Sequence, residues 1–104
     1  MMNEKIILLK VHKSYRLVIA VCDKEIYGKI FEEENKRLDL SGEFFNGEEM
    51  TEGETKQKII LYLKEDATFN IAGENSVALA KALGIISNEG IKKIDGVPLA
   101  MVLS

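Results

Sequence analysis

Cys22 and His12 are the two residues of this chain that thiol catalysis would need, because the sequence holds one cysteine and one histidine. A nucleophilic thiol requires a base within hydrogen-bond reach. If residues 13–15 form the loop of a hairpin, His12 lies beside Arg16, and Cys22 is six residues farther along the strand. At about 3.3 Å per residue, the two side chains are then roughly 20 Å apart. The sequence therefore predicts no catalytic dyad and favours a small, buried Cys22.

Sequence motifs for metals and nucleotides are missing as well. Zinc sites are built from several cysteine and histidine ligands, and two such residues are too few. The acidic run at residues 32–34 lacks the alternating spacing of a calcium loop. Gly73 stands alone and Gly28-Lys29 is not followed by serine or threonine, so neither the dinucleotide fingerprint nor the phosphate loop is present. We therefore expect no metal, no cofactor and no catalytic residue, and the sequence leaves open whether the chain is an enzyme.

A polar turn at residues 70–76 is the best position in the sequence for an anion. The turn contains a glycine and leads into an apolar run, which predicts a helix that ends at Gly84. A helix start offers free backbone N–H groups and the positive end of the helix dipole. The residues that we expect to bind an anion are Asn70, Gly73, Asn75 and Ser76. The same turn also fits an ordinary capped helix start, and Glu74 would repel an anion.

The basic end of the first hairpin is a second candidate surface. Cationic side chains there could lie along an RNA backbone while an aromatic ring stacks on one base. The residues of this surface are Lys10, Lys13, Tyr15 and Arg16. A net charge of −3 argues against a dedicated nucleic-acid-binding domain, which is usually strongly basic. The sequence therefore favours either a local patch within a larger ribonucleoprotein or a simply solvated hairpin end.

Phe44 and Phe45 form a third candidate, an interaction surface. Adjacent side chains on an extended segment point in opposite directions, so both rings cannot easily reach one core. We expect one ring to pack inside and the other to lie at a groove or a subunit contact. The alternative is that both rings pack as a lid over the core.

Two apolar runs rich in β-branched residues must position the basic hairpin. They cover residues 6–11 and 17–22, and the polar stretch between them predicts a β-hairpin. The second run lacks polar alternation, as expected of a central strand that is covered on both faces. Asp23 follows this run and is the expected N-cap of a short helical segment at residues 24–27.

Helices are predicted near residues 51–64 and 75–83, and Thr51 with Glu54 forms a capping box for the first. The expected buried stripe of this first helix is Ile59, Ile60, Tyr62 and Leu63.

A short strand is expected at 37–41, and a second hairpin at 91–94 and 97–103 around Asp95-Gly96. Pro98 lacks an N–H, so the last strand should start at a sheet edge or a bulge. The predicted fold class is α+β, with the N-terminal and C-terminal hairpins in one mixed or antiparallel sheet and the helices packed on it.

Composition predicts a single globular domain over residues 1–104. Hydrophobic residues make up 46% and charged residues 30%, which is typical of soluble proteins. The longest apolar run, residues 17–22, is too short for the roughly 20 residues that span a bilayer, so we expect no membrane association. One cysteine fits the reducing cytoplasm. Residues 30–54 carry nine acidic against two basic side chains, an asymmetry that either orients a partner or marks solvated loops.

Four blocks of residues, spread in order over nearly the whole chain, resemble one protein family. The blocks are residues 21–29, Phe44-Phe45-Asn46-Gly47, residues 70–74 and Gly96-Val97-Pro98. Together they are similar to an archaeal conserved family of unknown function (DUF424), whose members are stand-alone proteins of about a hundred residues. The resemblance implies a cytoplasmic archaeal protein, with an association with translation and no established activity. The family tends to place a histidine where this chain has Leu99, so chemistry at that histidine is not implied here.

Three hypotheses of different classes follow from these features. The first is a small binding module that contacts RNA or a ribonucleoprotein through the basic hairpin. The alternative is a protein or enzyme that holds an anionic small metabolite between the 70–76 turn and Phe44-Phe45, with Asp23 as a further polar group. The third is a homo-oligomer assembled through the last strand.

Overall fold

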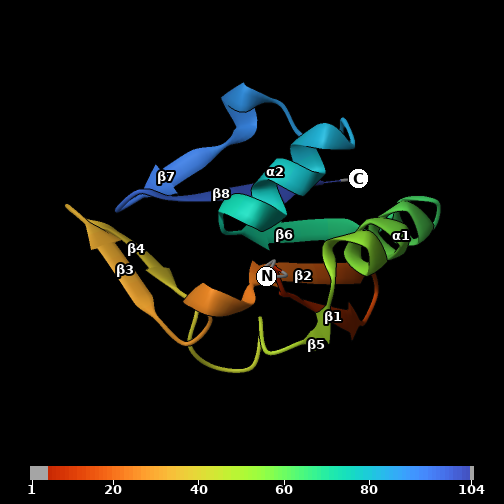
Figure 1. The fold of residues 1–104 in the computed structure, drawn as a ribbon, viewed down its shortest axis with the longest axis horizontal. Helices are drawn as coiled ribbons and strands as arrows, with labels where there is room; N and C mark the ends of the chain where they lie inside the picture. Colours follow the sequence, from red (N-terminus) through yellow and green to blue (C-terminus); the bar gives the residue numbers. More distant parts are fainter. Residues whose placement is uncertain (1–4, 104) are drawn as a thin grey trace, which may run out of the picture.

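A mixed sheet of six strands is the centre of the fold, and both helices pack against it (Figure 1). The computed structural model describes residues 5–103. In spatial order the strands are β5 (Glu48–Met50), β1 (Ile7–Lys13), β2 (Leu17–Asp23), β6 (Thr68–Ala72), β8 (Val97–Val102) and β7 (Lys92–Ile94). The helices are α1 (Glu52–Leu63) and α2 (Glu74–Ala82), with short 3₁₀ turns η1 (Lys24–Ile26) and η2 (Asn88–Gly90). The predicted α+β fold, with both terminal hairpins in one mixed sheet, is confirmed.

The first hairpin supplies the second and third strands of the sheet. β1 pairs antiparallel with β2 from Ile7↔Asp23 to Lys13↔Leu17, which leaves residues 14–16 as the loop. β2 also pairs in parallel with β6, so it is an interior strand, and its residues from Ile19 onward are buried. The uniformly apolar sequence of this strand follows from that interior position.

The main core lies between the sheet and the helices. Alternate residues of each strand point toward the helices, because side chains in a strand alternate between the two faces. The sheet contributes Ile7, Leu9, Ile19, Val21, Phe69 and Ile71, and the helices contribute Ile59, Val77 and Ala80. Thr55 is buried in α1 whereas Ile60 is 38% exposed, so the predicted buried stripe of this helix was wrong at Ile60. Thr55 lies about a turn and a half before Ile60, on the side of α1 that faces the sheet, and its hydroxyl donates to the Thr51 carbonyl. Ile60 therefore faces outward.

A smaller apolar cluster covers part of the opposite face of the sheet. β3 (Ile30–Glu33) and β4 (Lys36–Asp39) form a separate two-stranded sheet. This hairpin extends beside the β7–β8 hairpin (Figure 1), where the Asp95 amide donates to a Glu33 carboxylate oxygen at 2.7 Å. The buried members of the cluster are Cys22, Leu38, Leu40, Ala72 and Ile94.

Several local features differ from the sequence prediction. The strand expected at 37–41 exists as β4, but it belongs to the small sheet. β3 and β5 were not predicted, because glutamates make up half or more of each and short exposed strands have no clear apolar alternation. The Thr51 and Glu54 capping box is confirmed, and Asp95 and Gly96 both have positive φ, as the predicted hairpin turn requires.

Pro98 lies in β8, which pairs with β6 on one side and β7 on the other. The ladder with β6 begins at Leu99↔Ala72, one residue beyond Pro98. The Pro98 carbonyl points toward β6 and accepts from the Gly73 amide at 2.9 Å. The missing N–H of Pro98 therefore falls beyond the end of that ladder and removes no bond from it. Within residues 5–103, no helix is long and apolar enough to cross a membrane.

Candidate functional site

The hairpin between β1 and β2 carries the residues predicted to bind RNA. Tyr15 in the loop is wholly exposed, and Lys13 and Arg16 beside it are exposed as well. Lys10 is three residues before Lys13, so the two side chains leave opposite faces of β1. The structure therefore places Lys13, Tyr15 and Arg16 together at the hairpin end and sets Lys10 apart.

Lys10 and His12 hold the loop that precedes β5 against one face of the sheet. The Lys10 amine donates to the Glu43 carbonyl at 2.9 Å and lies 3.8 Å from the Glu43 carboxylate. The ring nitrogen Nε2 of His12 is 3.0 Å from the Phe44 carbonyl oxygen. Their position two residues apart on β1 explains why both side chains reach the same loop. Alternation along the strand is the sequence signal that could have grouped His12 with Lys10.

Phe44 stacks on His12, with ring centroids 4.6 Å apart and ring planes 10° from parallel. Phe45 meets Phe44 edge to face at 4.9 Å and packs against the smaller apolar cluster. Phe44 itself remains 42% exposed. The two rings thus divide between core and surface, and the role of Phe44 as an interaction surface stays a prediction.

The turn at 70–76 is joined to the end of β2 by a buried carboxylate. Asp23 accepts hydrogen bonds from the Asn75 amide at 2.9 Å, the Ser76 amide at 2.8 Å and the Ser76 hydroxyl at 2.6 Å. Both Asp23 and Ser76 are almost fully buried. The backbone donors that start α2 are therefore bonded to a carboxylate of the chain itself, which provides the negative charge that a helix N-terminus favours.

Asp23 was predicted to cap residues 24–27, but its side chain makes no capping bond to η1. Parallel pairing explains its actual role, because Cys22↔Ala72 brings the ends of β2 and β6 side by side. Gly73 makes the approach possible. Its φ is +108°, and a Cβ there would lie 2.4 Å from the Asp23 carboxyl carbon. The contact between Asp23 and the start of α2 could be predicted from the sequence only by recognising that an aspartate and a glycine follow two strands that pair in parallel.

Asn70 is separated from the rest of the predicted anion site. It pairs with Ala20 on β2 and Met101 on β8 in the middle of the sheet. Its side chain therefore lies on the face opposite the Asp23 side chain, because Asp23 and Ala20 are an odd number of residues apart on β2. The structure brings Gly73, Asn75 and Ser76 together and leaves Asn70 on the other face.

Cys22 is fully buried next to Asp23. Burial raises the pKa of the Cys22 thiol from its ordinary value of 9.0 to about 12, and the negative charge of Asp23 adds to the rise. The register places His12 opposite Val18, which is four residues from Cys22 rather than six, so their separation is roughly 13 Å. The predicted distance was too long, but the two groups still lie far beyond hydrogen-bond reach. Among residues 5–103, no group of three or more potential metal ligands is clustered.

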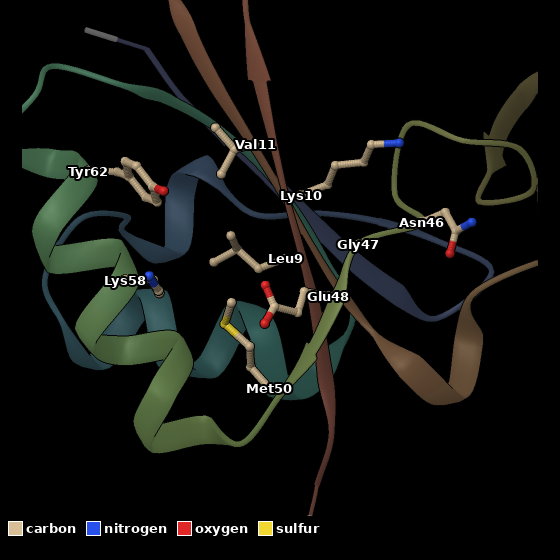
Figure 2. Close-up of a pocket in the computed structure, with 9 residues that line it drawn as sticks. All are labelled: Leu9, Lys10, Val11, Asn46, Gly47, Glu48, Met50, Lys58 and Tyr62. Atoms are coloured by element: carbon tan, nitrogen blue, oxygen red, sulfur yellow. The ribbon is translucent and has the colours of Figure 1, made fainter.

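A cavity of about 350 Å³ lies between α1 and the outer edge of β1, near β5 (Figure 2). The side chains that line it include Leu9, Val11, Glu48, Met50, Lys58 and Tyr62. None of the residues predicted to bind an anion contributes to its lining. The sequence signal for this site was weak, since Lys58 and Tyr62 are four residues apart on α1 and share one side of the helix.

The comparisons with known proteins agree with this architecture. A family described as "Protein of unknown function (DUF424)" matches residues 12–104. The crystal structure of an uncharacterized conserved protein from Methanopyrus kandleri has a similar fold, with a TM-score of 0.83 and 24% sequence identity over 94% of this chain and 92% of that chain. A comparison with curated proteins finds no match. Because the family match spans nearly all of the sequence, the chain belongs to the DUF424 family of proteins of unknown function.

Proposed function

We propose that this protein is a non-enzymatic binding module that contacts single-stranded RNA, alone or within a ribonucleoprotein. The observation that carries the proposal is the wholly exposed ring of Tyr15 at the hairpin end, flanked by Lys13 and Arg16. An aromatic ring offers a stacking surface to an unpaired base, and cations beside it attract the phosphates. A large aromatic side chain that contacts no core has no packing role to explain it.

The Phe44 ring offers a second surface on which a base could stack, on the same side of the protein as Lys10. Its ring is fixed on one side by His12, and the loop that carries it is anchored by the Lys10 amine. A ring held in place loses less conformational entropy on binding than a mobile one. In this arrangement Lys10 contributes mainly by positioning the loop, whereas Lys13 and Arg16 supply charge at the hairpin end.

The charge of the whole chain sets the expected strength of binding. With a net charge of −3, the protein as a whole repels a polyanion, whereas the cations at the hairpin end attract it. We therefore expect weak binding that decreases strongly with salt, as contacts to phosphates require. Such an affinity suits a module that acts beside other RNA-binding components.

The metabolite alternative gains no support from the 70–76 turn. The amides of Asn75 and Ser76 are bonded to Asp23, so an incoming anion would have to displace a buried carboxylate. It would also meet the negative charge of that group. We therefore keep the hairpin end as the proposed site.

The test is fluorescence anisotropy with a labelled oligouridylate at low and moderate salt. We expect Tyr15→Ala to weaken binding about tenfold, because stacking on one base contributes roughly 1–3 kcal/mol. Lys13→Glu should weaken it further and reduce the salt dependence. Lys36→Glu is the matched control, since Lys36 is an exposed lysine on the β3–β4 hairpin. The proposal fails if wild type does not bind, or if Tyr15→Ala and Lys13→Glu bind as well as Lys36→Glu.

A further inference from the structure

The hydrogen-bond pattern of β1 shows which of its residues face outward along the sheet. The Lys24 amide donates to Ile6 at 3.0 Å and the Ser14 amide to Arg16 at 3.2 Å, both in the register of the β1–β2 ladder. In an antiparallel pair, residues that bond the partner strand alternate with residues that do not. Even-numbered residues of β1 therefore bond β2, and odd-numbered residues direct their N–H and C=O groups to the opposite edge.

β5 covers only the first part of that edge. It pairs with β1 from Ile7↔Met50 to Leu9↔Glu48 and extends no farther. Gly47 then crosses close over β1, where a Cβ on it would lie 2.3 Å from the Leu9 carbonyl carbon. The outward backbone groups of Val11 and Lys13 lie beyond this crossing. Within the described part of the chain they have no backbone partner.

The cavity between α1 and β1 lies along the same edge. Figure 2 shows Leu9, Val11 and Met50 on the strand side and Tyr62 on the helix side, all around a shared space. Val11 and Tyr62 are each only half-buried against the main core. An apolar side chain could therefore enter beside Val11 and complete the cover of both residues.

The charges around the cavity are mostly positive. Lys58 lies at its helix side and Lys13 at the end of the exposed edge, on the same face of β1 as Val11. Neither lysine forms an ion pair with another residue among 5–103. Among residues 5–103, Glu48 is the one acidic residue that lines the cavity. This local charge is opposite in sign to that of the whole chain and complements an acidic segment.

We propose that the outer edge of β1 at Val11 and Lys13 binds an extended acidic segment of a partner protein, which adds to the sheet as a seventh strand beyond the end of β5. Main-chain bonds to Val11 and Lys13 give the affinity, and the side chains give the specificity. In antiparallel register, an apolar residue opposite Val11 enters the cavity. The residue two positions earlier lies opposite Lys13, and a carboxylate there forms an ion pair with it.

Two other occupants fit less well. A second copy that pairs through the same edge would bring together the cationic β1 strands of both copies, with like charges side by side. RNA has no regular series of N–H and C=O groups to continue a strand ladder, whereas an extended peptide segment does. The proposed RNA surface shares Lys13 with this edge, but Tyr15 and Phe44 do not line the cavity and Val11 is not part of the RNA surface. Variants of Tyr15 and Val11 therefore distinguish the two proposals.

The test uses a labelled, amidated peptide, Gly-Glu-Ser-Glu-Ser-Val, whose terminal valine lies opposite Val11 and whose second glutamate lies opposite Lys13, and the same peptide with lysine in place of both glutamates. Hydrogen exchange followed by NMR should show new protection of the Val11 and Lys13 amides when the acidic peptide is bound. The Lys10 and His12 amides already bond β2, so their exchange should change little. The lysine peptide should bind at least about fivefold more weakly, because the ion pair with Lys13 becomes a repulsion.

Matched variants separate this site from a general charge effect. Lys58→Glu should weaken binding of the acidic peptide about fivefold, whereas Lys56→Glu, an exposed control on the same helix, should not. Val11→Pro should abolish binding while the β1–β2 ladder remains, because the Val11 amide does not take part in it. If that variant does not fold, the exchange result on wild type decides the question.

Three outcomes would overturn the proposal. The first is unchanged exchange at Val11 and Lys13 under saturating peptide, and the second is equal binding of the acidic and lysine peptides. The third is protection of the same amides that depends on protein concentration without peptide, since that result identifies a second copy as the occupant. Tyr15→Ala should leave peptide binding unchanged, which keeps the result distinct from RNA binding.

Discussion

The carboxylate of Asp23 accepts two hydrogen bonds from Ser76, one from its backbone nitrogen at 2.8 Å and one from its hydroxyl at 2.6 Å. The two residues are 53 positions apart in the chain, and both are almost fully buried. Asp23 also bonds the Asn75 amide. A carboxylate from a strand thus replaces the side-chain cap that Gly73 cannot provide to α2. This link fixes the start of α2 to the end of the central strand.

Removal of the Asp23 carboxylate should destabilise the fold. Asp23→Ala leaves two buried donors of Ser76 and the partly buried Asn75 amide without this partner, and we expect a loss of about 3 kcal/mol in the free energy of unfolding. Asp23→Asn should lose somewhat less, since one amide oxygen can still accept. Urea denaturation measures the change, with Asp39→Asn as the exposed control. Equal stability of Asp23→Ala and the control would contradict a structural role for this carboxylate.

Gly73, which directly precedes α2, should tolerate no side chain. Gly73→Ala places a Cβ 2.4 Å from the Asp23 carboxyl carbon at a φ of +108°, so both the contact and the backbone are strained. We expect a loss of more than about 2 kcal/mol in unfolding free energy. Gly84→Ala is the control, because its φ is also positive but open space surrounds it. In Gly84→Ala, backbone strain alone should lower the free energy of unfolding by about 1 kcal/mol. Similar losses in the two variants would show that contact with Asp23 is unimportant.

The Cys22 thiol should be unreactive in the folded protein. Its pKa is raised to about 12 by burial and by the charge of Asp23, so the thiolate is scarce at pH 8.5. Alkylation by iodoacetamide should therefore be slow until urea unfolds the chain. Fast alkylation of the folded protein would mean that the strand end opens.

The same shift predicts a dependence of stability on pH. Between about 9 and about 12, the unfolded chain loses the Cys22 proton while the folded protein keeps it. The unfolded state then binds fewer protons, so stability falls as pH rises through this range. Lysines and tyrosines titrate there too, and the measured quantity is thus the difference between wild type and Cys22→Ala. Wild type should lose more stability with rising pH than the variant, and parallel curves would contradict the prediction.

The regular elements of this fold could be predicted because their signals are local. Thr51 and Glu54 lie three residues apart, and Asp95-Gly96 lies between two short predicted strands, so each pattern identifies its own structure. The first hairpin was equally clear, because its two strands are adjacent in the sequence. The β5 strand was not, since Glu48 and Glu49 become a strand only by pairing with β1.

The site residues were harder to predict because they depend on contacts between distant segments. Asp23 precedes a helical turn and looks like its cap, but parallel pairing of β2 with β6 delivers it to α2 instead. His12 gains its role from Phe44, 32 residues away, and nothing near either residue indicates the contact. The open edge at Val11 exists only because Gly47 takes the chain across β1. Such features follow from strand order and register, which a single sequence does not reveal.

Gly47 should control the position of the Phe44 ring. A Cβ at Gly47 would lie 2.3 Å from the Leu9 carbonyl carbon, and neither backbone can move easily, so Gly47→Ala must push the loop before β5 away from β1. The stack of Phe44 on His12 and the bond from Lys10 to Glu43 both depend on that loop, and we expect both to weaken. The free energy of unfolding should fall by about 2 kcal/mol.

Nuclear Overhauser contacts between the rings of His12 and Phe44 measure this displacement directly. They should be present in wild type, where the ring centroids are 4.6 Å apart, and absent in Gly47→Ala. Gly53→Ala is the matched control. Gly53 lies in the first turn of α1 with its nearest neighbour 4.0 Å from an added Cβ, so the change should stabilise the protein by about 0.5 kcal/mol. If the ring contacts persist in Gly47→Ala, the loop is held by Lys10 and His12 alone, and the close crossing at Gly47 does not determine where Phe44 lies.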